Sequence, residues 1–181
     1  MGGENGLVLA DDATGALECA SLLAGMGVAV SLSLGEARSG VCVVDAETRH
    51  LSGDAAAEVV RGLLSGWDGA VFKKTDSTLR GNIRAELGAM AALGTVAYVP
   101  AYPALGRTVR DGILYVHGVP LAETAFARDA RQPARSSRVA DVVPDGVRLF
   151  DGETEADLAA IARGLAGERP WVAGPAGFVR Y

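Results

Sequence analysis

The sequence has few of the residues that build disulfide frameworks, metal sites or hydrolytic triads. It holds 2 cysteines and 2 histidines in 181 residues. Cys19 and Cys42 fall in apolar segments and form neither a Cys-x-x-Cys pair nor a Cys/His cluster, so zinc and redox chemistry are not indicated. We expect both to be buried thiols in a reducing compartment. With only His50 and His117, and no Gly-x-Ser-x-Gly, a serine hydrolase is poorly supported.

Long hydrophobic runs and basic stripes are also missing. No apolar run reaches the length of a transmembrane span, and residues 1–5 lack the basic start and apolar stretch of a signal peptide. The net charge is −5, and Lys and Arg are spread along the chain, unlike the basic patch of a nucleic-acid-binding protein. The sequence therefore predicts a cytoplasmic protein with a small-molecule partner and with no nucleic acid or membrane partner.

Neither of the common glycine-rich phosphate-binding loops is present. The chain contains no Gly-x-x-x-x-Gly-Lys-Ser/Thr and no Gly-x-Gly-x-x-Gly. The nearest glycine-rich segment, residues 174–177, follows the last predicted strand. We therefore expect no complete nucleotide site, and no cofactor, within these residues.

The composition is that of an ordinary globular protein, with 49% hydrophobic and 22% charged residues. The length predicts one domain over residues 1–181. Short runs of Val, Leu and Ile alternate with segments of helical period, which indicates an α/β fold: a mainly parallel sheet of about six or seven strands with helices on both faces. The predicted strands are 6–10, 28–34, 41–45, 70–74, 95–99, 147–150 and 171–174, and the predicted helices are 14–26, 54–65, 80–93 and 155–166.

Residues 100–144 interrupt this alternation. They contain a predicted hairpin insertion near 113–121, with strands 113–116 and 119–121 around His117-Gly118. Connections of this length inside a compact domain are usually functional or disordered. The insertion is therefore either a lid or wall of a site, or a solvated connector.

Polar side chains gather where the predicted strands end. The first strand is followed by Asp11-Asp12, the third ends in Asp45, and the fourth runs into residues 73–78, Lys-Lys-Thr-Asp-Ser-Thr. In an open parallel sheet, ligands bind outside the carboxyl ends of the strands. These groups therefore predict a binding site along one rim of the sheet.

Asp11 and Asp12 lie on a strand-to-helix turn. One of the two has a simple structural interpretation, because aspartate is favoured as a helix N-cap. That interpretation does not account for both. The second carboxylate remains available to accept a hydrogen bond from a substrate hydroxyl or to act as a general base.

Residues 73–82 form the densest polar segment of the chain, at the start of a predicted helix. Helix N-termini attract anions, because their amide groups are unpaired and the helix dipole favours negative charge. Ser77 and Thr78 are predicted to hold a carboxylate, with a guanidinium fork from Arg80 and a point charge from Lys74. The alternative is a capped, solvent-facing helix start.

Four blocks of sequence carry a resemblance to a known family. They are residues 10–16 (Ala-Asp-Asp-Ala-Thr-Gly-Ala), 74–82 (Lys-Thr-Asp-Ser-Thr-Leu-Arg-Gly-Asn), 100–109 and 112–129. In order and spacing, the chain resembles the N-terminal domain of the four-carbon acid sugar kinases, which phosphorylate threonate, erythronate and 3-oxo-tetronates. Ala13 departs from the larger apolar residue usual in that family, which affects local packing only.

The resemblance implies a function for several residues. Asp12 is implied as the catalytic base, and the substrate-binding groups are Asp11, Lys74, Asp76, Ser77, Thr78, Arg80, Asn82 and Arg107, of which Lys74 and Thr78 come from the strand-end argument. The family's second half, which binds ATP and Mg²⁺, has no counterpart here. We therefore expect the sugar-acid-binding domain of a kinase, dependent on a nucleotide-binding domain or a separate chain. A stand-alone, non-catalytic sugar-acid sensor is the alternative. For both alternatives, a homodimer is a possible oligomeric state.

Overall fold

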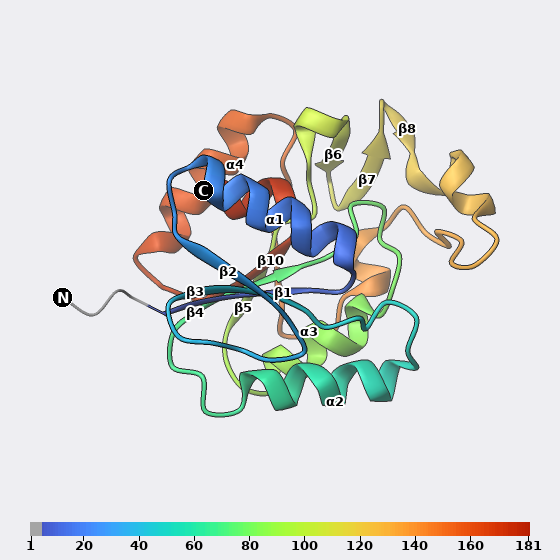
Figure 1. The fold of residues 1–181 in the computed structure, drawn as a ribbon. Coiled ribbons are helices and arrows are strands. Elements are labelled where there is room, and N and C mark those ends of the chain that lie inside the picture. The colour runs from blue at the N-terminus through green and yellow to red at the C-terminus, as the bar shows by residue number, and fades with distance from the viewer. Residues whose placement is uncertain (1–4) are drawn as a thin grey trace.

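The computed structural model describes residues 5–181. Residues 1–4, which belong to the segment judged unlike a signal peptide, lie outside this part. The chain forms a seven-stranded sheet in the order β2-β3-β1-β4-β10-β5-β9, and every pair of neighbours is parallel (Figure 1). The strands are β1 (Gly6–Ala10), β2 (Val30–Leu34), β3 (Val41–Asp45), β4 (Ala70–Lys74), β5 (Val96–Tyr98), β9 (Arg148–Leu149) and β10 (Trp171–Gly174).

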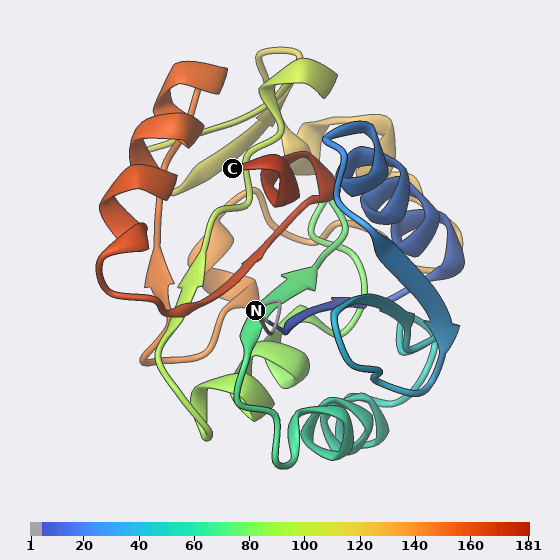
Figure 2. The ribbon, with the colours of Figure 1, turned by 60° about the vertical axis from the view of Figure 1, so that its left-hand side comes forward.

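Helices cover both faces of this sheet, as the sequence predicts. They are α1 (Ala13–Gly25), α2 (Gly53–Leu64), α3 (Ile83–Ala91) and α4 (Glu155–Ala166). Helices α2 and α3 lie below the sheet in Figure 1, and α1 lies above it. Figure 2 shows α1 and α4 on either side of the short C-terminal helix η5 (Ala176–Arg180). None of the helices in residues 5–181 is long and apolar enough to span a membrane.

The core is built in two layers because β1 is buried on both faces. Leu7 and Leu9 pack in the larger cluster, with side chains of α2 and α3. Val8 and Ala10 point the other way and pack with Cys19 and other residues of α1. Side chains alternate between the faces of a strand, so a central parallel strand reads as a continuous apolar run. This fixes the position of Asp11 and Asp12 at the carboxyl end of a rigid strand.

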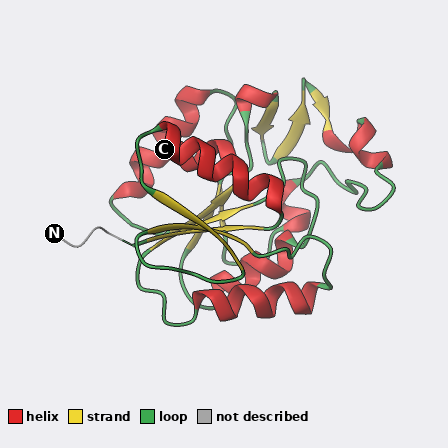
Figure 3. Cartoon of the chain, viewed as in Figure 1, coloured by secondary structure: helices red, strands yellow, loops and turns green. Residues whose placement is uncertain are grey.

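The insertion forms a separate antiparallel sheet of three strands (Figure 3). The predicted hairpin is present as β7 (Ile113–Val116) and β8 (Val119–Pro120), with Val116 opposite Val119. Its turn residues, His117 and Gly118, have φ of 49° and 81°, as a type I′ turn requires. A further strand, β6 (Arg107–Arg110), was not predicted, because only Val109 of its four residues is buried.

The segment between β4 and α3 differs from the expectation. The predicted helix 80–93 begins only at Ile83, because Leu79 and Gly81 have φ of 59° and 88°, outside the helical region. Residues 75–82 are therefore a loop at the carboxyl edge of the sheet. The polar side chains of this loop are arranged by their own hydrogen bonds and not by a helix N-terminus.

Candidate functional site

A small polar cavity lies at the carboxyl ends of β1 and β4. Its volume is about 170 Å³. Ligand sites are commonly several hundred Å³, so this cavity suits a small ligand. The polar side chains that line it are Asp12, Thr14, Glu18, Arg49, Lys74, Thr75, Asp76, Ser77, Arg80 and Tyr102.

Two cations hold the aspartate pair at the end of β1. Lys74 Nζ lies 3.0 Å from Asp11 Oδ1 and 3.0 Å from Asp12 Oδ1. Arg49 donates from Nε to Asp11 Oδ2 at 2.7 Å, and its NH1 lies 2.6 Å from Asp12 Oδ2. The Asp11 side chain is 3% exposed and that of Asp12 26%. Asp12 therefore faces the cavity, and Asp11 lies behind it.

The environment of Asp11 keeps it ionised. Burial alone would raise its pKa, but Lys73, Lys74 and Arg49 outweigh burial and lower the pKa below the ordinary value. Burial likewise opposes the charge of Lys74, and Asp11 and Asp12 raise its pKa. Both partners are therefore charged near neutral pH, and the cluster acts as a fixed electrostatic support for Asp12.

The turn after β1 explains how these groups reach one another. Asp12 is the N-cap of α1, and its Oδ1 accepts a hydrogen bond from Gly15 N at 2.9 Å. The capping role therefore falls on the aspartate that also lines the cavity. Gly15 is required for a different reason: a Cβ there would lie 2.2 Å from Lys74 Nζ. The glycine leaves the space through which Lys74 reaches both carboxylates.

We expect Gly15→Ala to displace the Lys74 side chain and to destabilise the domain by about 1–3 kcal/mol, the usual cost of overpacking. Urea denaturation measures the change. Gly25→Ala is the matched control, because Gly25 lies in the same helix and a Cβ added there would meet no atom within 4 Å. Equal stability of the two variants would contradict the role of Gly15.

The loop after β4 is organised around Asp76. Its Oδ1 accepts from Thr78 N at 2.8 Å and from Arg80 Nε at 3.1 Å, and its Oδ2 accepts from Arg80 NH2 at 2.8 Å. Burial opposes ionisation, but the hydrogen bonds from Arg80 and Thr78 lower the pKa of Asp76 to about 2. Arg80 also donates from NH1 to Asp129 Oδ2 at 3.0 Å. Asp76 and Arg80 thereby tie the insertion to the edge of the main sheet.

The structure brings some of the expected site residues to the cavity and leaves others outside it. Thr78 is buried and donates its hydroxyl to Asp76, and Asn82 Nδ2 donates to the carbonyls of Thr48 and Leu51. Both side chains stabilise the loop instead of lining the cavity. Those that do line it are Asp12, Lys74, Asp76, Ser77 and Arg80.

Two further polar residues named from the sequence lie away from the cavity lining. Arg107, on β6, and Arg80 each place the guanidinium carbon 5.7 Å from the centre of the Phe126 ring. Asp45 accepts a hydrogen bond from Glu47 N, and burial raises its pKa. Arg107 therefore supports the wall formed by the insertion, and Asp45 shapes the loop after β3.

Arg49 is the main residue that the sequence analysis missed. It contacts Asp11 and Asp12, and its NH2 lies 3.7 Å from Asp76 Oδ2. That NH2 nitrogen has no hydrogen-bond partner in the described part of the chain. The only signal in the sequence is a charged residue four positions after Asp45, in the loop that follows β3 at the same rim. Arg49 therefore offers a donor at the cavity wall.

The cavity is polar and balanced in charge. Among the lining residues, the carboxylates of Asp12, Glu18 and Asp76 are matched by three cations, Arg49, Lys74 and Arg80. Tyr102, which also lines the cavity, donates its hydroxyl to Glu18 Oε1 at 2.8 Å. The Ser77 hydroxyl has no hydrogen bond to any residue in 5–181. Such a lining can bind a small molecule that carries several hydroxyls and one carboxylate.

Within residues 5–181, no cluster of three or more His, Cys, Asp or Glu side chains is placed to hold a metal ion.

Comparison with known proteins places this chain in a family. A family described as the sugar-binding N-terminal domain matches residues 6–148, which include every charged residue of the cavity lining. The chain belongs to this family of sugar-binding N-terminal domains.

Its relatives include named kinases. The D-threonate kinase of Salmonella typhimurium is 40% identical over an alignment of 150 positions, which covers 76% of this chain and 36% of the relative. The D-erythronate kinase of Heliobacterium modesticaldum is 36% identical over an alignment of 155 positions, which covers 77% of this chain and 35% of the relative. This chain therefore spans little more than a third of the length of these two relatives.

A solved structure from Bordetella bronchiseptica shares the fold with a TM-score of 0.91 and 28% identity. The match covers 99% of this chain and 56% of the Bordetella protein, which is described as a domain-swapped dimer with bound citrate.

Proposed function

We propose that this domain binds a four-carbon sugar acid in the cavity at the carboxyl ends of β1 and β4, as the substrate-holding part of an ATP-dependent sugar-acid kinase. The observation that carries the proposal is the cavity itself: a small volume with balanced charge and spare donors on Ser77 and Arg49. Its charged residues lie inside the region shared with the sugar-binding family. The kinase names of the relatives supply the substrate class.

The proposed roles follow from the contacts. Asp12 Oδ1 already accepts from Gly15 N and Lys74, whereas Oδ2 interacts only with Arg49 in the described part of the chain. Oδ2 therefore keeps a lone pair for a substrate hydroxyl, which it orients and deprotonates as a general base. Lys74 and Arg49 hold Asp12 in place. Phosphoryl transfer depends mainly on such positioning and on charge stabilisation.

The phosphoryl donor comes from outside these residues in this proposal. ATP, with Mg²⁺, supplies the phosphoryl group from a nucleotide-binding domain or a separate chain, while residues 1–181 act as one binding domain. Alone, the domain binds its ligand without turnover. We place this activity in the cytoplasm, a setting that the buried and unpaired Cys19 and Cys42 support.

Isothermal titration calorimetry with D-threonate, D-erythronate and 3-oxo-tetronates tests the proposal. Threitol, which has the carbon chain and hydroxyls without the carboxylate, is the control ligand. We expect at least one acid to bind and threitol to bind more weakly. Binding of none of the acids overturns the assignment. Binding without phosphorylation when a nucleotide-binding domain of a relative is added favours a sensor.

We expect Arg80→Ala to weaken binding of the acid by about tenfold to a hundredfold. The loss of a charged hydrogen-bonding partner costs about 1.5–3 kcal/mol, and Arg80 both lines the cavity and holds Asp76. Calorimetry measures the affinity, and circular dichroism checks folding. Arg61→Ala, on the exposed surface of α2, is the matched control. An unchanged affinity in folded Arg80→Ala would move the anion site elsewhere.

A further inference from the structure

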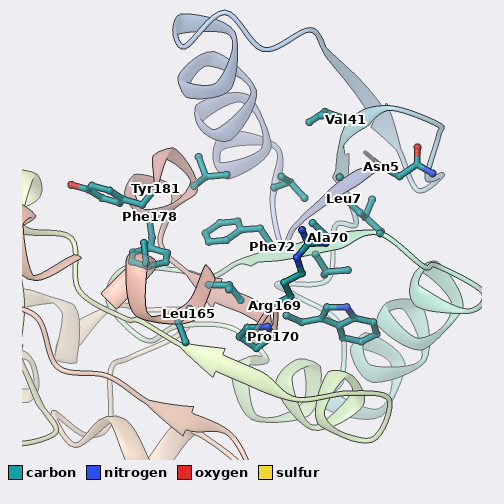
Figure 4. A pocket seen from close by; sticks show the side chains of 18 of the residues that line it. Asn5, Leu7, Val41, Ala70, Phe72, Leu165, Arg169, Pro170, Phe178 and Tyr181 are labelled. Atoms are coloured by element: carbon teal, nitrogen blue, oxygen red, sulfur yellow. The ribbon is translucent and has the colours of Figure 1, made fainter. Parts of the chain in front are cut away.

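A second and larger cavity lies on the face of the sheet that carries α1 and α4. Its volume is about 810 Å³, and it shares no lining residue with the sugar-acid cavity. Figure 4 shows its wall, which runs from Asn5 and Pro170, near the amino ends of the strands, to Phe178 and Tyr181. The two cavities are therefore separate sites.

The wall of this cavity is an uncovered part of the core. Phe72 of β4 and Val172 of β10 are only partly buried, although both strands are central in the sheet. Leu23 of α1 closes one side, and Ala162 and Ala166 of α4 line the other. Central parallel strands are normally covered on both faces. The gap between α1 and α4 is therefore where a further covering element is missing.

The size and chemistry of the cavity favour a polypeptide helix over a small ligand. An α-helix is about 10 Å across, so a cavity of 810 Å³ has the volume of a helix segment about 10 Å long, which is about two turns. Small-molecule sites combine an apolar wall with several convergent polar groups. Here Asn5, Asp68 and Arg169 lie at the amino-end rim, and the hydroxyl of Tyr181, at the other end, donates to Glu155.

The polypeptide around β10 indicates where such a helix enters. Helix η5 follows β10 and contacts α1, and its residues Phe178 and Val179 line the cavity together with Tyr181. After a parallel strand, the chain returns across a face of the sheet. In the Bordetella relative, 44% of the protein lies outside the match to this chain, since the match covers 56%. Polypeptide that follows this domain in such a relative starts at the rim of the cavity.

We propose that this cavity is the binding site of an amphipathic α-helix, belonging to the polypeptide segment that follows this domain in the longer relatives. About two turns of its apolar face fill the space over Phe72 and Val172, and α1 and α4 flank it. The helix completes the cover of the sheet and joins the sugar-acid domain to the polypeptide beyond it. The apolar lining of the cavity therefore selects a partner with matching chemistry, which is a helix with an apolar stripe.

A peptide from the Bordetella relative tests this. It comprises about 25 residues after the position matching Tyr181, carries a fluorescein label, and is titrated with the intact 181-residue protein by fluorescence anisotropy. We expect saturable binding that is at least tenfold weaker in Ala162→Glu/Ala166→Glu. Ala156→Glu/Ala160→Glu is the matched control, because it makes the same change at exposed positions of α4 outside the cavity lining.

Two further measurements keep the test independent of peptide affinity. In a Trp67→Phe background, binding should shift the fluorescence of Trp171, which lines the cavity. The same segment fused after Tyr181 should raise the midpoint of thermal unfolding by about 4 °C or more, and Ala162→Glu/Ala166→Glu should remove the gain. Binding unaffected by that double variant, or a fusion without added stability, overturns the proposal. A homodimer that only this variant dissociates would assign the surface to a second copy instead.

Discussion

Lys74→Met is expected to lower the free energy of unfolding by about 3–5 kcal/mol and to abolish binding of the sugar acid. Lys74 is the common partner of Asp11 and Asp12, and its side chain is only 8% exposed. The variant leaves the buried Asp11 with Arg49 as its one remaining ion-pair partner in the described part of the chain. Breaking a buried ion pair is far more costly than losing a surface pair. Urea denaturation and calorimetry measure the two effects.

The dependence on pH distinguishes this electrostatic effect from a packing defect. In the native protein the pKa of Asp11 is lowered, so its contribution to stability is present above the ordinary value of 3.8 and is lost as the pH falls. In Lys74→Met, burial of Asp11 is opposed by fewer cations, which favours its protonated form. The loss of stability should therefore shrink below about pH 4. A loss that is constant with pH would indicate a packing defect.

Arg148→Met is the matched control for this variant. It removes a charge from an ion pair with Glu168 on the exposed surface. Exposed pairs contribute about 0–1 kcal/mol, so this variant should be nearly as stable as the native protein.

Lys73→Met is expected to destabilise the domain by a similar 3–5 kcal/mol, for a different reason. Lys73 is 0% exposed, and its Nζ lies 3.1 Å from Glu86 Oε2, which joins β4 to α3 under the Asp76 loop. Thr48 donates its hydroxyl to the same carboxylate. The single variant leaves Glu86 buried and charged without its ion-pair partner.

A double-mutant cycle isolates the ion pair. Lys73→Met/Glu86→Met removes both charges, so it should recover at least half of the stability lost in Lys73→Met, because buried pairs are often replaceable by apolar residues. Recovery is not complete, since Thr48 then loses its acceptor. A double variant as unstable as the sum of the single variants would contradict this account. Denaturation of all four proteins in urea gives the coupling free energy.

The central strands could be predicted from the sequence and the peripheral ones less well. The bounds predicted for β1, β3, β4 and β10 agree with the structure. These are central strands of a parallel sheet, and each begins with a short apolar run that stands out in the sequence. The strand predicted at 147–150 is reduced to Arg148–Leu149 at the edge of the sheet. Strand β6 was not predicted, because it forms by pairing with β7 and its sequence lacks the apolar run of a buried strand.

The candidate site could be predicted in location but not in detail. The rule that strand ends meet at one rim places Asp12, Lys74 and Ser77 together, and the structure brings them to one cavity. Arg49 reaches that cavity through a loop whose path depends on tertiary packing. Asn82 shows the converse, since an amide side chain that suits a ligand also suits the backbone carbonyls of a loop.

The position of β10 has a consequence for how the chain acquires its structure during synthesis. This strand is the last of the sheet to leave the ribosome, yet it lies in the middle of the sheet, between β4 and β5. Until residues 171–174 emerge, β4 and β5 are two unpaired edges, and unpaired edges are prone to aggregate. The carboxylates and cations of the sugar-acid cavity come from residues translated much earlier, but the sheet that fixes them closes only when this last strand has been made.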